Sequence, residues 1–100
     1  MTAYCAAKHG VNGLTRSAAL DHARDGVRIN SVCPGLIDSR ILEKTFEESP
    51  ELREIYMASQ PMGRIGSPHE IGDAVLWLCS ESATLMNGAV VAVDGGFSAQ

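Results

Sequence analysis

A chain of 100 residues, 45% hydrophobic and 20% charged, has the size and composition of one small globular domain. Its net charge of −4 and the absence of a Lys/Arg cluster argue against binding to nucleic-acid phosphates. No apolar run is long enough to span a membrane, and no basic start leads into an apolar stretch with a cleavage site. We therefore expect a cytoplasmic protein without membrane or nucleic-acid partners.

The first predicted element is a helix over residues 2–24, which are rich in Ala and Leu. Gly10 and Gly13 each lower helix propensity by roughly 1 kcal/mol relative to Ala, and we expect them to let another backbone approach closely. Asp25-Gly26 ends the helix. Four apolar residues form a stripe at helical spacing: Ala7, Val11, Leu14 and Ala18.

A strand over 27–33 follows, ended by Pro34-Gly35. Two short helices are predicted over 41–48 and 51–59, separated by Pro50.

The next helix has three agreeing start signals. Ser67 is a predicted N-cap, Pro68 takes the first helical position, and Glu70 completes a capping box. This helix is expected to run to about Ser80.

The last predicted elements are a turn at Asn87-Gly88 and an apolar strand over 89–93. Two strands joined through helical crossovers are expected to be parallel, which predicts an α/β fold. Two parallel strands alone leave edges and faces uncovered, so the chain is read as one end of a larger sheet. We also expect marginal stability, with apolar surface exposed on helix 2–24 and strand 27–33.

Three cysteines, Cys5, Cys33 and Cys79, are odd in number and widely spaced. This pattern favours buried, reduced thiols over a disulfide framework. Cys5 and His9 stand four residues apart, as in half of a metal site, but no second half has matching spacing. We expect no metal.

The chemistry that the sequence suggests lies at its start, in Tyr4 and Lys8. Residues four apart on a helix face each other, so the Lys8 ammonium can approach the Tyr4 phenol. An adjacent cation and the positive end of the helix both favour the phenolate, which suits a general acid or base. A single tyrosine and lysine at this spacing are also typical of a solvated lysine beside a half-buried tyrosine. The spacing alone leaves both the catalytic and the structural interpretation open.

Several motifs in order give this pair more weight. They are YCAAKHGVNGLTRSAALDHARDGVRINSVCPGLIDSRI at the start, then PMGRIGSPHEIGDAVLWLCS and NGAVVAVDGG. Together they resemble the C-terminal portion of the short-chain dehydrogenase/reductase family, starting just before its Tyr-x-x-x-Lys motif. The resemblance implies part of a Rossmann-type doubly wound parallel sheet, with residues 1–100 forming a single incomplete domain. It also implies NAD or NADP as cofactor and hydride transfer between the nicotinamide and a carbonyl or alcohol substrate.

The resemblance assigns roles to individual residues. Tyr4 matches the catalytic tyrosine, and Lys8 matches the lysine that tunes it and holds the nicotinamide ribose. Pro34, Gly35, Ile37 and Ser39 match the loop against the nicotinamide, with the Ile37 backbone at the carboxamide and Ser39 replacing a common threonine. Without Tyr4 and Lys8 upstream, Pro34-Gly35 would read as an ordinary strand-ending turn.

Residues 36–60 match the substrate-covering segment of the family. Their apolar side chains suit either a lid over a neutral or amphipathic substrate or simple amphipathic packing, and the sequence does not decide between these. These side chains are Ile41, Leu42, Phe46, Leu52, Ile55, Tyr56 and Met57.

Other parts of the family's machinery have no match in this chain. None of its ten glycines falls in a G-x-G-x-x-G, G-x-x-x-G-x-G or P-loop pattern, and no residue matches the family's catalytic serine and asparagine. We therefore interpret the chain as a fragment, with Met1 an internal methionine, that is inactive alone.

The alternative interpretation is a non-catalytic oligomerisation or interaction module. The resemblance implies a homo-oligomer, a dimer or tetramer, for the full-length form. Neither the substrate nor the choice between NAD and NADP can be read from these residues.

Overall fold

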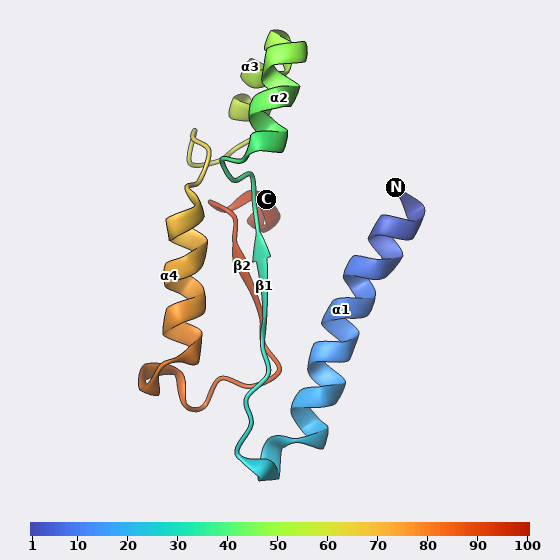
Figure 1. Cartoon of the computed structure of the whole chain (residues 1–100), viewed down its shortest axis with the longest axis vertical. Helices are drawn as coiled ribbons and strands as arrows, with labels where there is room; N and C mark the ends of the chain where they lie inside the picture. Colours follow the sequence, from blue (N-terminus) through green and yellow to red (C-terminus); the bar gives the residue numbers. More distant parts are fainter. The chain divides into compact units, whose positions relative to one another are not determined.

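The computed structural model describes residues 1–100 and has the predicted α/β architecture (Figure 1). It divides into two compact units. The first comprises residues 1–32 and 75–91, and the second comprises residues 33–74 and 92–100. The main elements in chain order are α1 (Thr2–Asp21), β1 (Ser31–Pro34), α2 (Arg40–Glu48), α3 (Pro50–Ala58), α4 (Pro68–Cys79) and β2 (Val90–Val93).

The strands β1 and β2 pair in a two-stranded sheet. In the first unit the Ser31 N–H donates to the Ala89 carbonyl at 2.9 Å, and in the second the Gly35 N–H donates to the Val93 carbonyl at 3.0 Å. Both bonds join residues with the same offset along the chain, which is the register of parallel strands. The predicted parallel pair is therefore confirmed.

Helix α1 ends slightly before the predicted position. The α-helix stops at Asp21, residues Ala23–Asp25 form a 3₁₀ turn, and Gly26 follows with φ of 75°. This left-handed conformation suits glycine, so Gly26 is the stop that the sequence predicted.

Helix α1 buries a different face in its unit from the one that carries its apolar stripe. Thr15 and Ala19 are its buried residues, whereas Val11 and Leu14 are exposed. The buried face is set by the segment before β2, because the Asn87 side-chain amide donates to the Ala19 carbonyl at 3.0 Å. Nothing lies within 4 Å of a Cβ built on Gly10 or Gly13, so the close approach expected there is absent from this unit.

Strand β1 starts later than predicted, at Ser31 instead of Val27. Over residues 28–30, side chains make most of the bonds to the segment before β2. Arg28 and Asn30 donate to the Met86 carbonyl, and the Asn87 side-chain oxygen accepts from the Ile29 N–H. A regular backbone ladder therefore begins only where these side-chain contacts end.

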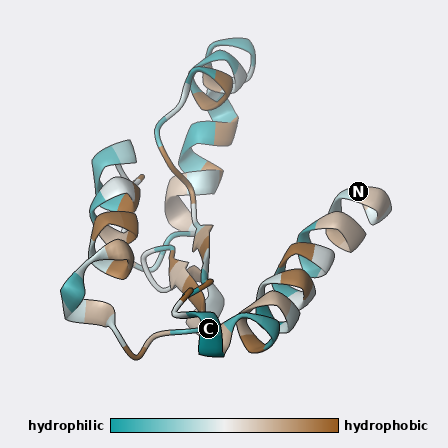
Figure 2. Cartoon of the chain, turned by 60° about the horizontal axis from the view of Figure 1, so that its bottom comes forward, coloured by the Kyte–Doolittle hydropathy of each residue, from teal (hydrophilic) through white to brown (hydrophobic).

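Little apolar surface is buried in the structure. Ala19, Leu78 and Ala83 are the buried hydrophobic residues, and Leu14, Leu20 and Leu76 are largely exposed. Figure 2 shows hydrophobic residues recurring along the exposed length of α1. The expectation of exposed apolar surface on the first helix is confirmed. The expectation of buried thiols is wrong for Cys5 and Cys79, which are exposed. Each lies on a helix face that no other part of the first unit covers.

In the second unit, α2 and α3 form a helical hairpin. Pro50, predicted to separate the two helices, is itself the first residue of α3, where its missing N–H costs nothing. The rings of Phe46 and Tyr56 lie 5.9 Å apart at a tilt of 52°, and Arg53 lies 5.9 Å from the Phe46 ring. These contacts join the two helices.

None of the helices in the structure combines the length and apolar character needed to cross a membrane.

Candidate functional site

Tyr4 and Lys8 come together on the first two turns of α1. The Lys8 ammonium lies 5.4 Å from the centre of the Tyr4 ring, which confirms the proximity predicted from their spacing. Tyr4 is 60% exposed, and the first turn of α1 carries no acidic residue. An accessible phenol with a cation beside it, at the positive end of a helix, can exchange a proton with a bound molecule.

The other predicted site residues, Pro34, Gly35, Ile37 and Ser39, lie in the second unit, at the end of β1 and in the loop that follows it. The loop is held close to the end of β2. A Cβ built on Gly35 would lie 2.6 Å from the Asp94 Cα, closer than real Cβ atoms come to a backbone. Only glycine fits there without a shift, so Gly35 fixes the approach of the loop to β2.

The same loop is also held by Gly66. The Gly66 N–H donates to the Leu36 carbonyl, and the Asp38 N–H donates to the Gly66 carbonyl, both at 2.9 Å. These two bonds form a parallel bridge between Ile37 and Gly66. Because the residues on either side of Ile37 make these bonds, Ile37 directs its own N–H and C=O away from Gly66.

The main-chain groups of Ile37 are therefore open to a ligand. Its N–H and C=O make no backbone hydrogen bond in the structure. One residue thus offers a donor and an acceptor together, as needed to pair with a group that carries both an acceptor and a donor, such as a primary carboxamide.

Ser39 has a structural role that the sequence did not reveal. It is the N-cap of α2, and its hydroxyl oxygen accepts from the Leu42 N–H at 3.3 Å. A hydroxyl can still donate its proton while it accepts, so the capping bond leaves the Ser39 donor available to a second partner.

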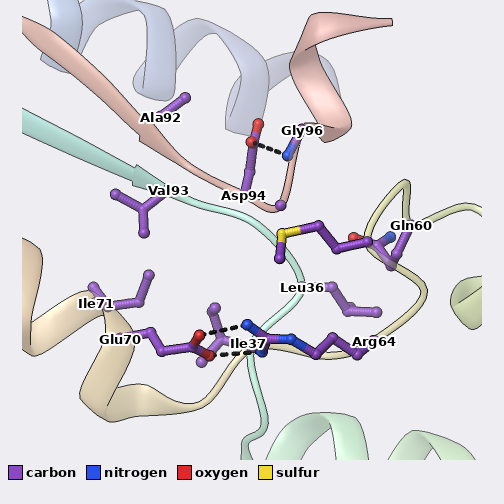
Figure 3. Close-up of a pocket in the computed structure, with 13 residues that line it drawn as sticks. Leu36, Ile37, Gln60, Arg64, Glu70, Ile71, Ala92, Val93, Asp94 and Gly96 are labelled. Atoms are coloured by element: carbon purple, nitrogen blue, oxygen red, sulfur yellow. Dashed lines mark hydrogen bonds and ion pairs between the residues drawn. The ribbon is translucent and has the colours of Figure 1, made fainter.

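A cavity of about 310 Å³ borders this loop at Leu36 and Ile37, between the start of α4 and the end of β2 (Figure 3). Arg64 and Glu70 form a two-bond ion pair at 2.9 and 2.6 Å in its wall. The Arg64 hydrogen bonds, followed by one from the Ser67 N–H, lower the pKa of Glu70 to about 2. The bond from Ser67 is the capping contact that the sequence predicted for Glu70.

Asp94 organises the turn that follows β2. Its carboxylate accepts from the N–H groups of Gly96 and Ser98, both at 3.0 Å. Hydrogen bonds from the Ser98 hydroxyl and backbone lower the pKa of Asp94. Asp94 thereby fixes the C-terminal turn, which the positive φ angles of Gly95 and Gly96 allow.

Two apolar cavities flank the loop within the second unit. One, of about 410 Å³, lies between the loop and α2, and the other, of about 500 Å³, lies between the loop, α3 and Phe97. Tyr56 lines both cavities. No pattern in the sequence pointed to Phe97, a single aromatic residue after a Gly-Gly turn.

The predicted site residues thus fall into two groups. Tyr4 and Lys8 meet in the first unit, and Pro34, Gly35, Ile37 and Ser39 share one loop in the second. No group of three or more His, Cys, Asp or Glu side chains is arranged to hold a metal ion.

Comparisons with known proteins extend over nearly the whole chain. A family model described as enoyl-(acyl carrier protein) reductase matches residues 1–98. Short-chain dehydrogenase RED2 of Pyricularia oryzae is 46% identical over 96 residues, which are 96% of this chain and 34% of that protein.

Solved structures agree with this match. The TT0495 protein from Thermus thermophilus superposes with a TM-score of 0.88 and 41% identity, over 100% of this chain and 41% of that one. ElxO with NADP bound superposes with a TM-score of 0.88 and 31% identity, over 97% of this chain and 39% of that one. The chain therefore spans well under half the length of each of these relatives.

Proposed function

The chain belongs to the short-chain dehydrogenase/reductase family. We propose that it is part of an NAD- or NADP-dependent oxidoreductase that acts on a small carbonyl or alcohol substrate. The observation that carries the proposal is the accessible Tyr4 phenol with the Lys8 ammonium 5.4 Å from its ring. The bound NADP in the structure of ElxO supports the choice of cofactor.

In the proposed reaction, the nicotinamide accepts or supplies the hydride when the cofactor is bound. Tyr4 gives a proton to the carbonyl oxygen during reduction and takes one from the hydroxyl during oxidation. Lys8 stabilises the phenolate and donates hydrogen bonds to the ribose hydroxyls of the cofactor. Both roles need polar side chains that a ligand can reach, as the exposure of Tyr4 provides.

The loop over residues 34–39 is proposed to hold the nicotinamide. The free N–H and C=O of Ile37 bind the carboxamide, and the Ser39 hydroxyl donates a further hydrogen bond. Gly35 and the Gly66 bridge keep these main-chain groups in place before a ligand arrives. Such preorganisation lowers the ordering cost of binding.

We also propose that residues 1–100 correspond to the C-terminal portion of such an enzyme, as a single incomplete domain. The order of the motifs supports this, as does the lack of a glycine-rich phosphate motif among the ten glycines. On this proposal the 100 residues alone neither bind the cofactor tightly nor turn over substrate, and the active form is a cytoplasmic homo-oligomer.

A direct test is to express the longest open reading frame that contains these residues and to follow NADH and NADPH absorbance with a panel of ketones and alcohols. Turnover is expected, and Tyr4→Phe should abolish most of it, whereas His9→Gln on the next turn of α1 should leave it within a few-fold. Full activity in Tyr4→Phe would refute the role of Tyr4. Micromolar NADPH binding by the 100 residues alone, measured by calorimetry, would refute the proposal that they are incomplete.

A second candidate function is a non-catalytic interaction module. The exposed Val11, Leu14 and Leu20 on α1 favour it, because exposed apolar residues along one helix can pack against another subunit. Sedimentation of the 100 residues, alone and with a full-length relative, tests this function. A monomer at high concentration in both runs would exclude it.

A further inference from the structure

Gly66 makes both hydrogen bonds of the bridge to the loop, yet it lies outside every helix and strand. It belongs to the irregular segment 63–67 between α3 and α4. Residues in such a segment keep a fixed position only when other groups hold them. The open N–H and C=O of Ile37 depend on the bridge, so whatever holds Gly66 also decides where these groups point.

Glu70 fixes the chain on both sides of Gly66. Its carboxylate accepts two hydrogen bonds from Arg64, which precedes Gly66, and one from the N–H of Ser67, which follows it. Glu70 itself belongs to the first turn of α4, so the helix sets its position. The three bonds therefore tie an irregular segment to a regular one.

The Glu70 carboxylate also lies against Gly66 itself. A Cβ built on Gly66 would stand 3.5 Å from Glu70 Oε2 and 2.7 Å from Ile37 Cδ1. Figure 3 shows the ion pair of Arg64 and Glu70 beside Ile37. The Glu70 carboxylate and the Ile37 side chain thus both pack where Gly66 has no side chain, at the bridge.

The ion pair is better suited to fixing a position than to stabilising the fold. The side chains of Arg64 and Glu70 remain 49% and 43% exposed, and exposed pairs contribute little net stability. Two parallel bonds from a planar guanidinium nevertheless fix the orientation of both partners. The pKa of Glu70, lowered to about 2, keeps its carboxylate ionised at neutral pH.

We propose that Glu70 is a positioning residue for cofactor binding: with Arg64 it holds Gly66, and through the bridge it aims the Ile37 main chain at the nicotinamide carboxamide. The inference rests on the proposed function, which places the carboxamide at Ile37. A loop that is already ordered binds its ligand more tightly. Loss of Glu70 should therefore raise KM for the cofactor more than it lowers kcat.

The kinetic test uses the active form, expressed from the full reading frame, and follows alcohol oxidation with NAD⁺ or NADP⁺ and with the 3-acetylpyridine analogue of that cofactor. The analogue carries a methyl group in place of the carboxamide NH₂, so it cannot donate to the Ile37 carbonyl. The wild-type preference for the carboxamide, as a ratio of kcat/KM values, should shrink about fivefold or more in Glu70→Ala. The intrinsic reactivity of the analogue cancels, because both enzymes use the same two cofactors.

Hydrogen exchange of the same proteins without cofactor, followed by mass spectrometry, reports on the loop directly. Peptides with the amides of Asp38 and Gly66 should exchange several-fold faster in Glu70→Ala, since both amides donate within the bridge. The Ser31 amide, which donates to the Ala89 carbonyl, should keep its protection. Glu70→Gln retains an oxygen for the Ser67 N–H, so it should give intermediate results, and it carries both tests if Glu70→Ala does not fold.

Asn87→Ala is the matched control, because it also removes side-chain bonds to the backbone but lies in the first unit. It should leave the carboxamide preference and the exchange of the bridge amides unchanged. An unchanged preference in Glu70→Ala, or unchanged exchange at Asp38 and Gly66, would overturn the inference. If the wild type turned over with neither NAD⁺ nor NADP⁺, the proposed function would fail, and faster exchange at the bridge would show separately that Glu70 holds the loop.

Discussion

The Glu70 carboxylate accepts two hydrogen bonds from the Arg64 guanidinium, at 2.9 and 2.6 Å, and a third from the Ser67 N–H at 2.8 Å. Three donors on one carboxylate join the loop before α4 to the first turn of that helix. The pair is solvent-exposed, so salt screens it and its net contribution to stability is modest.

Acid should weaken this contact within a defined range of pH. The pKa of Glu70 is lowered from 4.5 to about 2, so its ionised form stabilises the fold above about pH 4.5, and this contribution is lost as the pH falls toward 2. Glu70→Gln should therefore lower the urea midpoint at pH 7 and make little difference near pH 2. Glu54→Gln is the matched control, and an equal effect of Glu70→Gln at both pH values would contradict the prediction.

Gly35→Ala should destabilise the chain by about 1–3 kcal/mol, because the new Cβ meets the Asp94 backbone and the loop must shift. Gly10→Ala provides the contrast. It adds a Cβ in open space on α1 and should stabilise the chain by about 0.5–1 kcal/mol. Denaturant unfolding of the two variants measures both effects, and equal midpoints would contradict the close approach at Gly35.

Asn87→Ala should lower stability by about 1 kcal/mol, the net value of hydrogen bonds near the surface. The Asn87 side chain donates to the Ala19 carbonyl and accepts from the Ile29 N–H, so its removal breaks two contacts to the backbone. Asn12→Ala, which breaks a single bond to the Ser31 hydroxyl, should cost less. Hydrogen exchange at the Ile29 amide offers a local readout, and unchanged protection there would count against the prediction.

Lys8→Met should reduce kcat of the active form by about 10² or more, since it removes the cation beside the Tyr4 ring while keeping an unbranched side chain. It should also raise KM for the cofactor if Lys8 binds the ribose. Arg16→Met, farther along α1, is the control for loss of a positive charge. Equal kinetics in the two variants would remove Lys8 from the proposed mechanism.

Local rules predicted the features that depend on neighbours in sequence. The i, i+4 spacing placed Lys8 beside Tyr4, Gly26 ended the first helical segment, and the contact between Ser67 and Glu70 formed as a capping box predicts. Each of these depends on a few consecutive residues, whose geometry a helix or turn fixes.

Features that depend on distant partners could not be predicted in this way. The late start of β1 follows from contacts of Arg28 and Asn30 with Met86, more than fifty residues away. The buried face of α1 is set by Asn87, and the wall formed by Phe97 requires α3 beside the C-terminal turn. No periodicity within a single segment reports such pairings.

The bridge between Ile37 and Gly66 has a consequence for how the loop can vary. The groups left open at position 37 belong to the main chain, so they survive any side-chain replacement that preserves the bridge. Under the proposed function, a library randomised at position 37 should keep carboxamide binding in many of its members, whereas one randomised at position 35 should retain almost only glycine. Binding of this kind would be encoded by the neighbours that shape the backbone, and comparing residue 37 alone between proteins would miss it.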